Sequence, residues 1–181
     1  SEKEKKQAEK AWVFLEKLEK EEKIEFQIIL SSPLSRAFDT ASIINQKLQV
    51  PLEKNSLLRE RNYGVFESMK KKEAAEQYPE LYARYKKEKP FVDLPEGETA
   101  LAVEERVLKL FQDVIAKKYQ NLNEIILVGH LNIVRAAFRL LGLSDWDVYF
   151  QPFQNASISR IQIEKSGIAF GFCDKCPLEE E

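Results

Sequence analysis

The sequence has few of the residues on which several classes of protein depend, and each shortage excludes something. Its 181 residues include one histidine and two cysteines, so a zinc site built from these residue types is not expected. No apolar run approaches the roughly 20 residues of a membrane-spanning helix, and the charged first residues are unlike a secretory leader. Lysine and arginine (28) nearly balance aspartate and glutamate (30), which predicts no affinity for nucleic acid.

The remaining composition is that of an ordinary globular domain, because 44% of the residues are hydrophobic and 32% are charged. We therefore expect one cytoplasmic domain with no membrane contact. The two cysteines, Cys173 and Cys176, form a single CxxC just before Pro177. A redox CxxC would open a helix after a strand, so we interpret these two as incidental thiols and expect no metal and no cofactor.

A junction between a strand and a helix is the first candidate site. Residues 24–30 form a short apolar run, typical of a buried strand, and Ser-Ser-Pro stops it. An amphipathic helix over 34–48 follows, with Arg36 in its first turn. Ligands of open α/β sheets lie at the carboxyl ends of strands, and a helix start with an arginine suits a phosphate. The alternative is an ordinary connection in which Ser32 caps the helix and Arg36 lies on the surface.

A second junction of the same kind contains the only histidine. Residues 124–129 are the clearest strand, His130 stands at its end, and residues 131–141 predict a helix. In a parallel sheet His130 would share an edge with Arg36. The alternative is a buried imidazole satisfied by a backbone partner.

The third candidate is Glu60, which lies between Arg59 and Arg61 just before Asn-Tyr-Gly. A carboxyl beside phosphate oxygens is suited to donate a proton to a leaving group. A cluster of surface ion pairs is the alternative interpretation.

The other segments predict helices and one hairpin. Residues 65–98 form a charged, tyrosine-rich insertion with two short helices separated near Pro79. Strands are expected over 155–163 and 168–172, and further helices over 3–22 and, with Thr99 as N-cap, over 99–118. The apolar face predicted for the helix over 3–22 consists of Ala8, Ala11, Trp12, Leu15 and Leu18, and that of the helix over 99–118 consists of Val103, Val107, Leu110, Phe111, Val114 and Ile115. Glycine-rich loops of the GxGxxG or GxxxxGK kind are absent from the sequence, which argues against a nucleotide-binding domain.

Four stretches, in this order, resemble the histidine phosphatase superfamily, the phosphoglycerate mutase-like proteins. They are SSPLSRAFDTA at 31–41, LRERNYG at 58–64, Gly97-Glu-Thr with Arg106, and IILVGH at 125–130. The resemblance implies an α/β fold, a three-layer α/β/α sandwich with a mostly parallel central sheet. It also implies a single domain over 1–181 that is incomplete at its N-terminus, with residues 65–98 capping the site. The family's first strand ends in Arg-His-Gly, and this sequence has no such segment.

The resemblance assigns roles to particular residues. It implies that Glu60 is the general acid and that His130 stabilises the transition state. It implies phosphate contacts for three residues, Arg36, His130 and Asn155. Arg61 and Tyr63 are the candidates for contact with the rest of the substrate. Leu131 departs from the family, which usually has glycine after this histidine.

The function implied is phosphomonoester hydrolysis through a phosphohistidine, by an enzyme of the phosphatase branch, because the insertion is shorter than in the mutases. The nucleophilic histidine would lie in the Arg-His-Gly segment, so this chain alone is expected to be inactive. The alternative is a non-catalytic domain of the same fold that binds a phospho-ligand or a protein. The expected partners are a small phosphorylated substrate or a phosphate-like anion, and either a second copy or a partner that completes the sheet.

Overall fold

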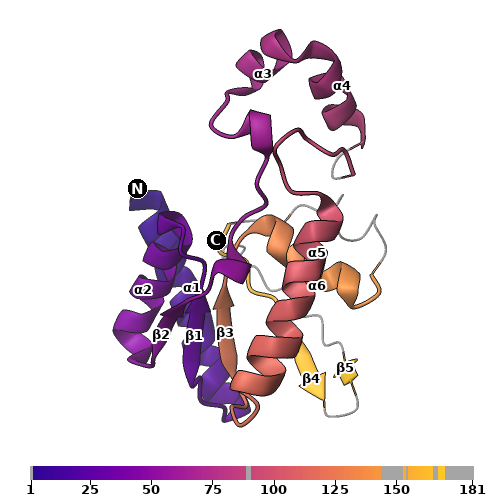
Figure 1. Ribbon diagram of the computed structural model, residues 1–181. Helices are drawn as coiled ribbons and strands as arrows, with labels where there is room; N and C mark the ends of the chain where they lie inside the picture. Colours follow the sequence, from indigo (N-terminus) through magenta and orange to yellow (C-terminus); the bar gives the residue numbers. More distant parts are fainter. Residues whose placement is uncertain (1, 89–90, 144–152, 154, 165–166, 170–181) are drawn as a thin grey trace.

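The computed structural model describes residues 2–88, 91–143, 153, 155–164 and 167–169 (Figure 1). A parallel sheet of three strands lies at its centre, in the order β2-β1-β3. The strands are β1 (Ile28–Ser31), β2 (Leu52–Lys54) and β3 (Ile125–Val128). The register pairs Ile29 of β1 with Leu52 on one side and with Ile126 on the other.

Successive side chains of β1 point to opposite faces of the sheet, and this alternation builds two cores. Ile29 packs in a cluster with Ala11, Leu15 and Ile44. These side chains come from the helices α1 (Glu2–Glu22) and α2 (Ser35–Leu48), which cover this face (Figure 1). The apolar stripes predicted for residues 3–22 and 34–48 are therefore the buried faces of the two helices.

The opposite face carries the second core, which contains Ile28 and Leu30 of β1 together with Val107 and Ala136. Three helical segments cover it: α5 (Ala100–Lys109), its continuation η3 in wider π-type turns (Leu110–Lys118), and α6 (Leu131–Leu140). The three layers confirm the predicted α/β/α sandwich with a parallel sheet.

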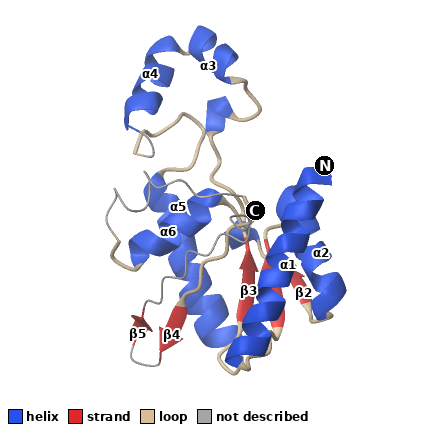
Figure 2. Ribbon diagram, turned by 180° about the vertical axis from the view of Figure 1, so that it is seen from behind, coloured by secondary structure: helices blue, strands red, loops and turns tan. Residues whose placement is uncertain are grey.

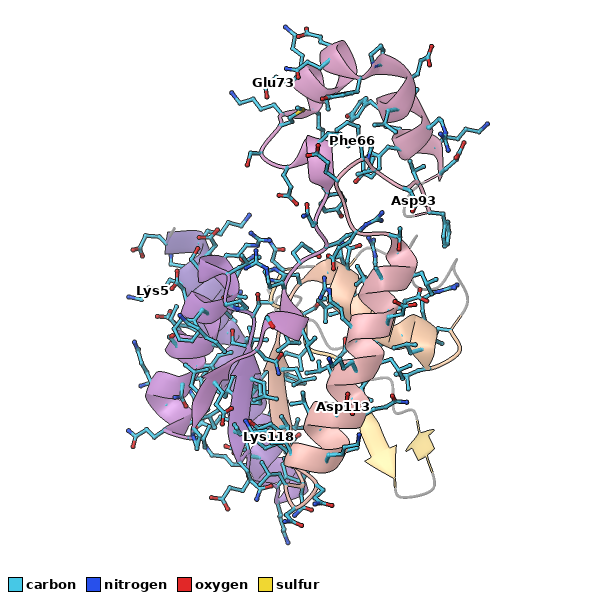
Figure 3. All side chains as sticks on the ribbon, in the orientation of Figure 1. Lys5, Phe66, Glu73, Asp93, Asp113 and Lys118 are labelled. Carbon is cyan, nitrogen blue, oxygen red and sulfur yellow. The ribbon has the colours of Figure 1, made fainter. Side chains whose placement is uncertain are left out.

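The insertion forms a pair of short helices that stands clear of the sheet in both views (Figures 1 and 2). Its elements are η2 (Gly64–Phe66), α3 (Lys71–Gln77) and α4 (Pro79–Glu88). Phe66 lies at the base of this α3–α4 pair (Figure 3) and meets Tyr78, Tyr82 and Tyr85 edge-on, with ring centroids 5.7–6.0 Å apart. The two predicted helices and their separation at Pro79 are confirmed.

Several boundaries differ from the predictions. The first strand begins at Ile28 rather than Ile24, because Phe26 turns its N–H toward the Glu19 carboxylate instead of a neighbouring strand. Ser32 is not the N-cap of α2: the cap position is Leu34, and its N–H donates to the Ser32 hydroxyl at 3.3 Å. Between β2 and Glu60 the chain forms one short 3-10 turn, η1 (Ser56–Leu58).

The C-terminal region contains the predicted hairpin in shorter form. Strands β4 (Gln162–Glu164) and β5 (Gly167–Ala169) pair antiparallel. The far part of the predicted second strand lies outside the described residues, as do Cys173 and Cys176. Over the part of the chain that the structure describes, no helix is both long and apolar enough to span a membrane.

Candidate functional site

The carboxyl ends of β1 and β3 meet through the side chains that follow them. The Ser32 N–H donates to the Val128 carbonyl at 2.8 Å, which continues the pairing one residue beyond the strands. His130 is the N-cap residue of α6, and its extended backbone (φ −132°, ψ 167°) directs the chain out of the sheet. Its Nε2 lies 2.8 Å from the hydroxyl oxygen of Ser32. Both side chains are buried, so this contact fixes the imidazole at the edge of the sheet.

Charged groups surround His130 and change its acidity. Burial lowers the pKa of the imidazole below 6.5, and the positive charges of Arg36, Arg106 and Arg59 lower it further. Glu60 opposes this shift in the pKa of His130 without cancelling it. The imidazole is therefore neutral near pH 7 when no anion is bound.

Glu60 is held beside the start of α6. Its Oε1 accepts the Asn132 Nδ2–H at 3.0 Å and the Arg61 backbone N–H at 2.8 Å. Asn132 follows His130 by two residues, so these bonds bring the candidate acid next to the candidate phosphate clamp. Among the hydrogen bonds of the described residues none reaches Oε2.

Arg36 lies in the first turn of α2 and is exposed. Within the described residues its guanidinium has no hydrogen bond or ion pair; only its backbone carbonyl is used, by Thr40. The donors of Arg36 are thus available to a ligand at the edge where His130 stands.

Arg61, the other candidate for contact with the substrate, is buried. It is only 2% exposed, and its Nε and Nη2 donate to the backbone carbonyls of Glu98 and Val92 at 2.8 and 3.0 Å. These donors face the interior of the protein, because 61–65 and 92–98 run side by side here. We call these two segments the neck, since they connect the α3–α4 pair to the sheet (Figure 1).

Tyr63 lies in the neck, half-buried, and its hydroxyl accepts the second Asn132 Nδ2–H at 2.8 Å. Its ring also covers the Arg61 guanidinium, 5.7 Å from the ring centroid. Glu60, Tyr63 and His130 are therefore brought together at the start of α6. Asn155 is exposed in a turn, and no hydrogen bond of the described residues joins it to the other predicted site residues.

Glu98 and Arg106 form a second fixed pair beside the site. Arg106 donates from Nε and Nη2 to the two carboxylate oxygens at 2.8 and 3.0 Å, and from Nη1 to the Leu57 carbonyl at 2.7 Å. Burial favours a raised pKa for Glu98, but Arg106 and the Asn62 N–H outweigh it and hold the pKa below its usual value. The Glu98–Arg106 ion pair joins the neck to α5. Because these contacts use its donors, Arg106 has fewer donors than Arg36 to offer a ligand.

Glu98 and Arg106 belong to the sequence motifs, but the sequence predicted no role for either. Ser32 and Asn132 were not predicted as site residues. The signal for Asn132 is its position in the first turn of a helix that begins at a site histidine. Figure 3 shows the charged side chains Asp113, in the first turn of η3, and Lys118, at its last residue, away from this edge. Within the described residues no group of three acidic, histidine or cysteine side chains has the placement to hold a metal ion.

The chain belongs to the histidine phosphatase superfamily (branch 1), whose family model matches residues 1–172. It is 31% identical over 158 residues to a 2,3-bisphosphoglycerate-dependent phosphoglycerate mutase of Neisseria meningitidis, covering 71% of this chain and 70% of that protein. The mutase of the same name from Enterococcus faecalis is 30% identical over 158 residues, covering 71% and 69%.

Solved structures with the same fold include the alpha-ribazole phosphatase of Shigella flexneri (TM-score 0.76, 20% identity, 98% of this chain and 84% of that one). A mycobacterial glucosyl-3-phosphoglycerate phosphatase in complex with inorganic phosphate matches similarly (TM-score 0.77, 21% identity, 99% and 89%). The predicted resemblance and fold are thus confirmed. At the level of the superfamily the chemistry is phosphoryl transfer, in which both phosphatases and mutases take part.

Proposed function

We propose that this protein hydrolyses small phosphomonoesters through a phosphohistidine, and that this chain supplies the phosphate clamp and the proton donor. The observation that carries the proposal is the hydrogen bond from Asn132 to Glu60, which holds this carboxyl at the start of α6, two residues after His130. Arg36 adds an exposed guanidinium whose charge reaches the same imidazole. Such chemistry depends mainly on placing positive groups where charge develops on the phosphoryl oxygens.

The clamp consists of Arg36, His130 and the N-terminal end of α6. Free N–H groups and the positive end of the helix dipole favour an anion there. A bound phosphate dianion stabilises the charged imidazole, so binding draws a proton onto His130, which is neutral beforehand. We retain Asn155 as a proposed further contact, on the resemblance alone.

Glu60 is the proposed acid, and Oε2 is its working oxygen because Oε1 already accepts two N–H groups. The negative charge of a bound phosphate favours the protonated form of a neighbouring carboxyl. The proton then passes to the departing alkoxide oxygen as the phosphorus–oxygen bond breaks. We propose Tyr63 as a contact for the rest of the substrate, whereas the buried donors of Arg61 suit a role in holding the neck.

The nucleophile is proposed to be a histidine that these 181 residues do not contain, because His130 is their only histidine and serves the clamp. An Arg-His-Gly segment at the end of an added strand would supply it. β3 forms an edge of the three-stranded sheet and is the proposed place for that strand to pair. Without the segment the chain is expected to bind phosphate and hydrolyse nothing.

The α3–α4 pair is proposed to cap the site and to select the substrate. Phosphatase activity is proposed in preference to mutase activity because the insertion over 65–98 is short, with two helices of 7 and 10 residues. The nucleophile of the added segment would then pass its phosphoryl group to water.

Vanadate binding to the purified chain, followed by calorimetry, tests the clamp. Arg36→Ala removes charge-assisted hydrogen bonds and is expected to weaken binding roughly 10- to 100-fold. Arg84→Ala, an exposed arginine of α4, is the matched control and is expected to bind like the parent chain. Equal losses in both variants, or none in Arg36→Ala, would remove Arg36 from the clamp.

Turnover of p-nitrophenyl phosphate tests the reaction itself. Activity is expected after an Arg-His-Gly segment is joined to the chain or added as a peptide, and the unaltered chain is expected to be inert. Steady hydrolysis by the unaltered chain that disappears in His130→Ala would show that His130 is the nucleophile.

The second candidate function is a non-catalytic domain that binds a phospho-ligand. Leu131 favours it, because this 37%-exposed side chain follows His130 where a phosphate would approach the backbone. Vanadate binding without turnover in the presence of the Arg-His-Gly segment would support this second function.

A further inference from the structure

Asn132 links Glu60 to the neck through both hydrogens of its amide. One Nδ2–H is donated to Glu60 Oε1 at 3.0 Å and the other to the Tyr63 hydroxyl at 2.8 Å. The side chain is only 7% exposed, so water has little access to these donors. A shift of either acceptor would leave a buried N–H without its partner, which is costly. Asn132 therefore responds to the position of Tyr63 as much as to that of Glu60.

Tyr63 is in turn joined to the α3–α4 pair through Tyr85 of α4. The two rings meet edge-on at 87° with centroids 6.2 Å apart. Burial, and then the neighbouring Tyr63, raise the pKa of Tyr85 to about 12, so its hydroxyl keeps its proton at any working pH. Tyr85 also packs on Phe66, which seats it in the aromatic cluster of the pair.

The carboxyl of Glu60 is the other end of this connection. Its Oε1 is held by Asn132 and by the Arg61 N–H, and these two bonds fix the rotation of the carboxyl about its last bond. The Arg61 N–H belongs to the rigid part of the neck, where its own side chain is clamped by backbone carbonyls. The Asn132 bond is the one that depends on Tyr63, and hence on α4.

We propose that Asn132, Tyr63 and Tyr85 are positioning residues through which the α3–α4 pair sets the direction of the Glu60 carboxyl. When α4 is seated, Tyr63 holds the Asn132 amide in place, and Oε2 of Glu60 is turned toward the phosphate site. When α4 moves away, the amide loses one acceptor and turns, and Oε1 loses one of its two donors. The proton donor is then aligned only while the α3–α4 pair is seated. The inference rests on the proposed role of Glu60 as the acid.

The connection itself can be tested on the chain as it is, without turnover. In a ¹⁵N-labelled sample the side-chain amide signals of Asn132 are identified by their loss in Asn132→Asp. Tyr85→Leu is expected to shift these signals, because the ring that meets Tyr63 edge-on is removed while an apolar side chain is kept. Tyr78→Leu is the matched control: Tyr78 also meets Phe66, at 6.0 Å, but no ring contact of the described residues joins it to Tyr63. Unchanged Asn132 signals in Tyr85→Leu, or equal shifts in both variants, would overturn the connection.

Its effect on proton donation is tested in the protein supplied with the Arg-His-Gly segment. Tyr85→Leu, which removes the ring that meets Tyr63, is expected to lower kcat for an alkyl phosphate, whose leaving group needs the proton, by roughly tenfold, a typical size for coupling of this kind. For p-nitrophenyl phosphate, whose leaving group does not, the loss is expected to be less than about twofold. Equal losses on both substrates would overturn the positioning role. If the parent protein with the segment shows no turnover, the proposed function fails, and the amide signals still decide whether the connection exists.

Discussion

The layered body and the α3–α4 pair are held together by different kinds of contact. In the body, aliphatic side chains such as Ile29 (0% exposed) and Leu30 (1%) alternate from β1 into two packed cores. In the pair, half-buried rings meet edge-on around Phe66. Apolar volume therefore stabilises the body, whereas the geometry of a few rings and hydrogen bonds holds the pair. His130 lies in the packed body, whereas Tyr85 lies in the pair that these few ring contacts hold together.

The neck lies between the layered body and the α3–α4 pair, and its two segments approach each other closely. Gly64 has a positive φ of 53°, and a Cβ there would lie 2.0 Å from the carbonyl oxygen of Pro95. The Val65 N–H donates to the same oxygen at 3.0 Å. The two segments can run this close only because no side chain stands between them.

This difference between the body and the α3–α4 pair predicts the largest loss of stability when a side chain is truncated in the body. Leu30→Ala is expected to lower the free energy of unfolding by about 3–5 kcal/mol, since it removes a fully buried side chain from the core beneath α5 and α6. Urea denaturation followed by circular dichroism measures it. Val13→Ala, at a side chain that is 60% exposed, serves as the control and is expected to cost less than about 0.5 kcal/mol. Similar costs for the two variants would refute the assignment of the core.

A substitution in the neck is expected to come next. Gly64→Ala combines an unfavourable φ with a clash against backbone, so we expect a loss of roughly 2–4 kcal/mol in the free energy of unfolding. Gly142→Ala is its partner experiment, because Gly142 also has a positive φ (85°) but no atom within 4 Å of its Cβ position. That variant is expected to lose about 1 kcal/mol. If the two substitutions destabilise equally, backbone strain alone explains both and the close approach in the neck is wrong.

Within the pair the expected effect is smaller and local. Phe66→Leu keeps an apolar side chain but removes three edge-on ring contacts, for which we expect roughly 1–2 kcal/mol. Limited proteolysis of the segment 65–98 should accelerate while the urea midpoint of the body changes little. A fall of that midpoint as large as the one in Leu30→Ala would mean that the pair and the body unfold as one unit, contrary to the comparison.

The smallest expected effect is a pH dependence that originates in the body. Burial lowers the folded-state pKa of His130 below its unfolded value of 6.5, so the unfolded chain takes up the proton first as the pH falls. The stability tied to the neutral imidazole is therefore present above pH 6.5 and is lost as the pH falls through the folded pKa. His130→Gln should flatten this part of the profile, measured as Tm between pH 8 and 5.

The carboxylates provide the internal control for that profile. Glu98 has a lowered pKa in the folded state, so its stabilising contribution is lost only below its ordinary value of 4.5. An unchanged slope above pH 5 in His130→Gln would show that the imidazole is not held neutral by burial.

The sequence by itself determined the layers and the position of the two strand ends. The apolar run before Ser-Ser-Pro and the run before His130 are short, and each is followed by an amphipathic helix, which is sufficient for parallel strands with site residues at one edge. Helical periodicity predicted which faces of α1, α2 and α5 are buried. The order of the motifs then identified the family, and these motifs contain Arg36, Glu60 and His130.

Only the tertiary structure decided which of these side chains can meet a ligand. Arg36 and Arg61 are both arginines in predicted site segments. Arg36 is exposed, whereas Arg61 is only 2% exposed and lies among backbone carbonyls. The contact of Ser32 with His130 joins positions 98 residues apart, and that of Asn132 with Glu60 joins positions 72 apart. Local periodicity encodes which face of an element is buried. The partner of a polar side chain instead depends on sheet register and on the crossing of the neck, which exist only once the chain has folded.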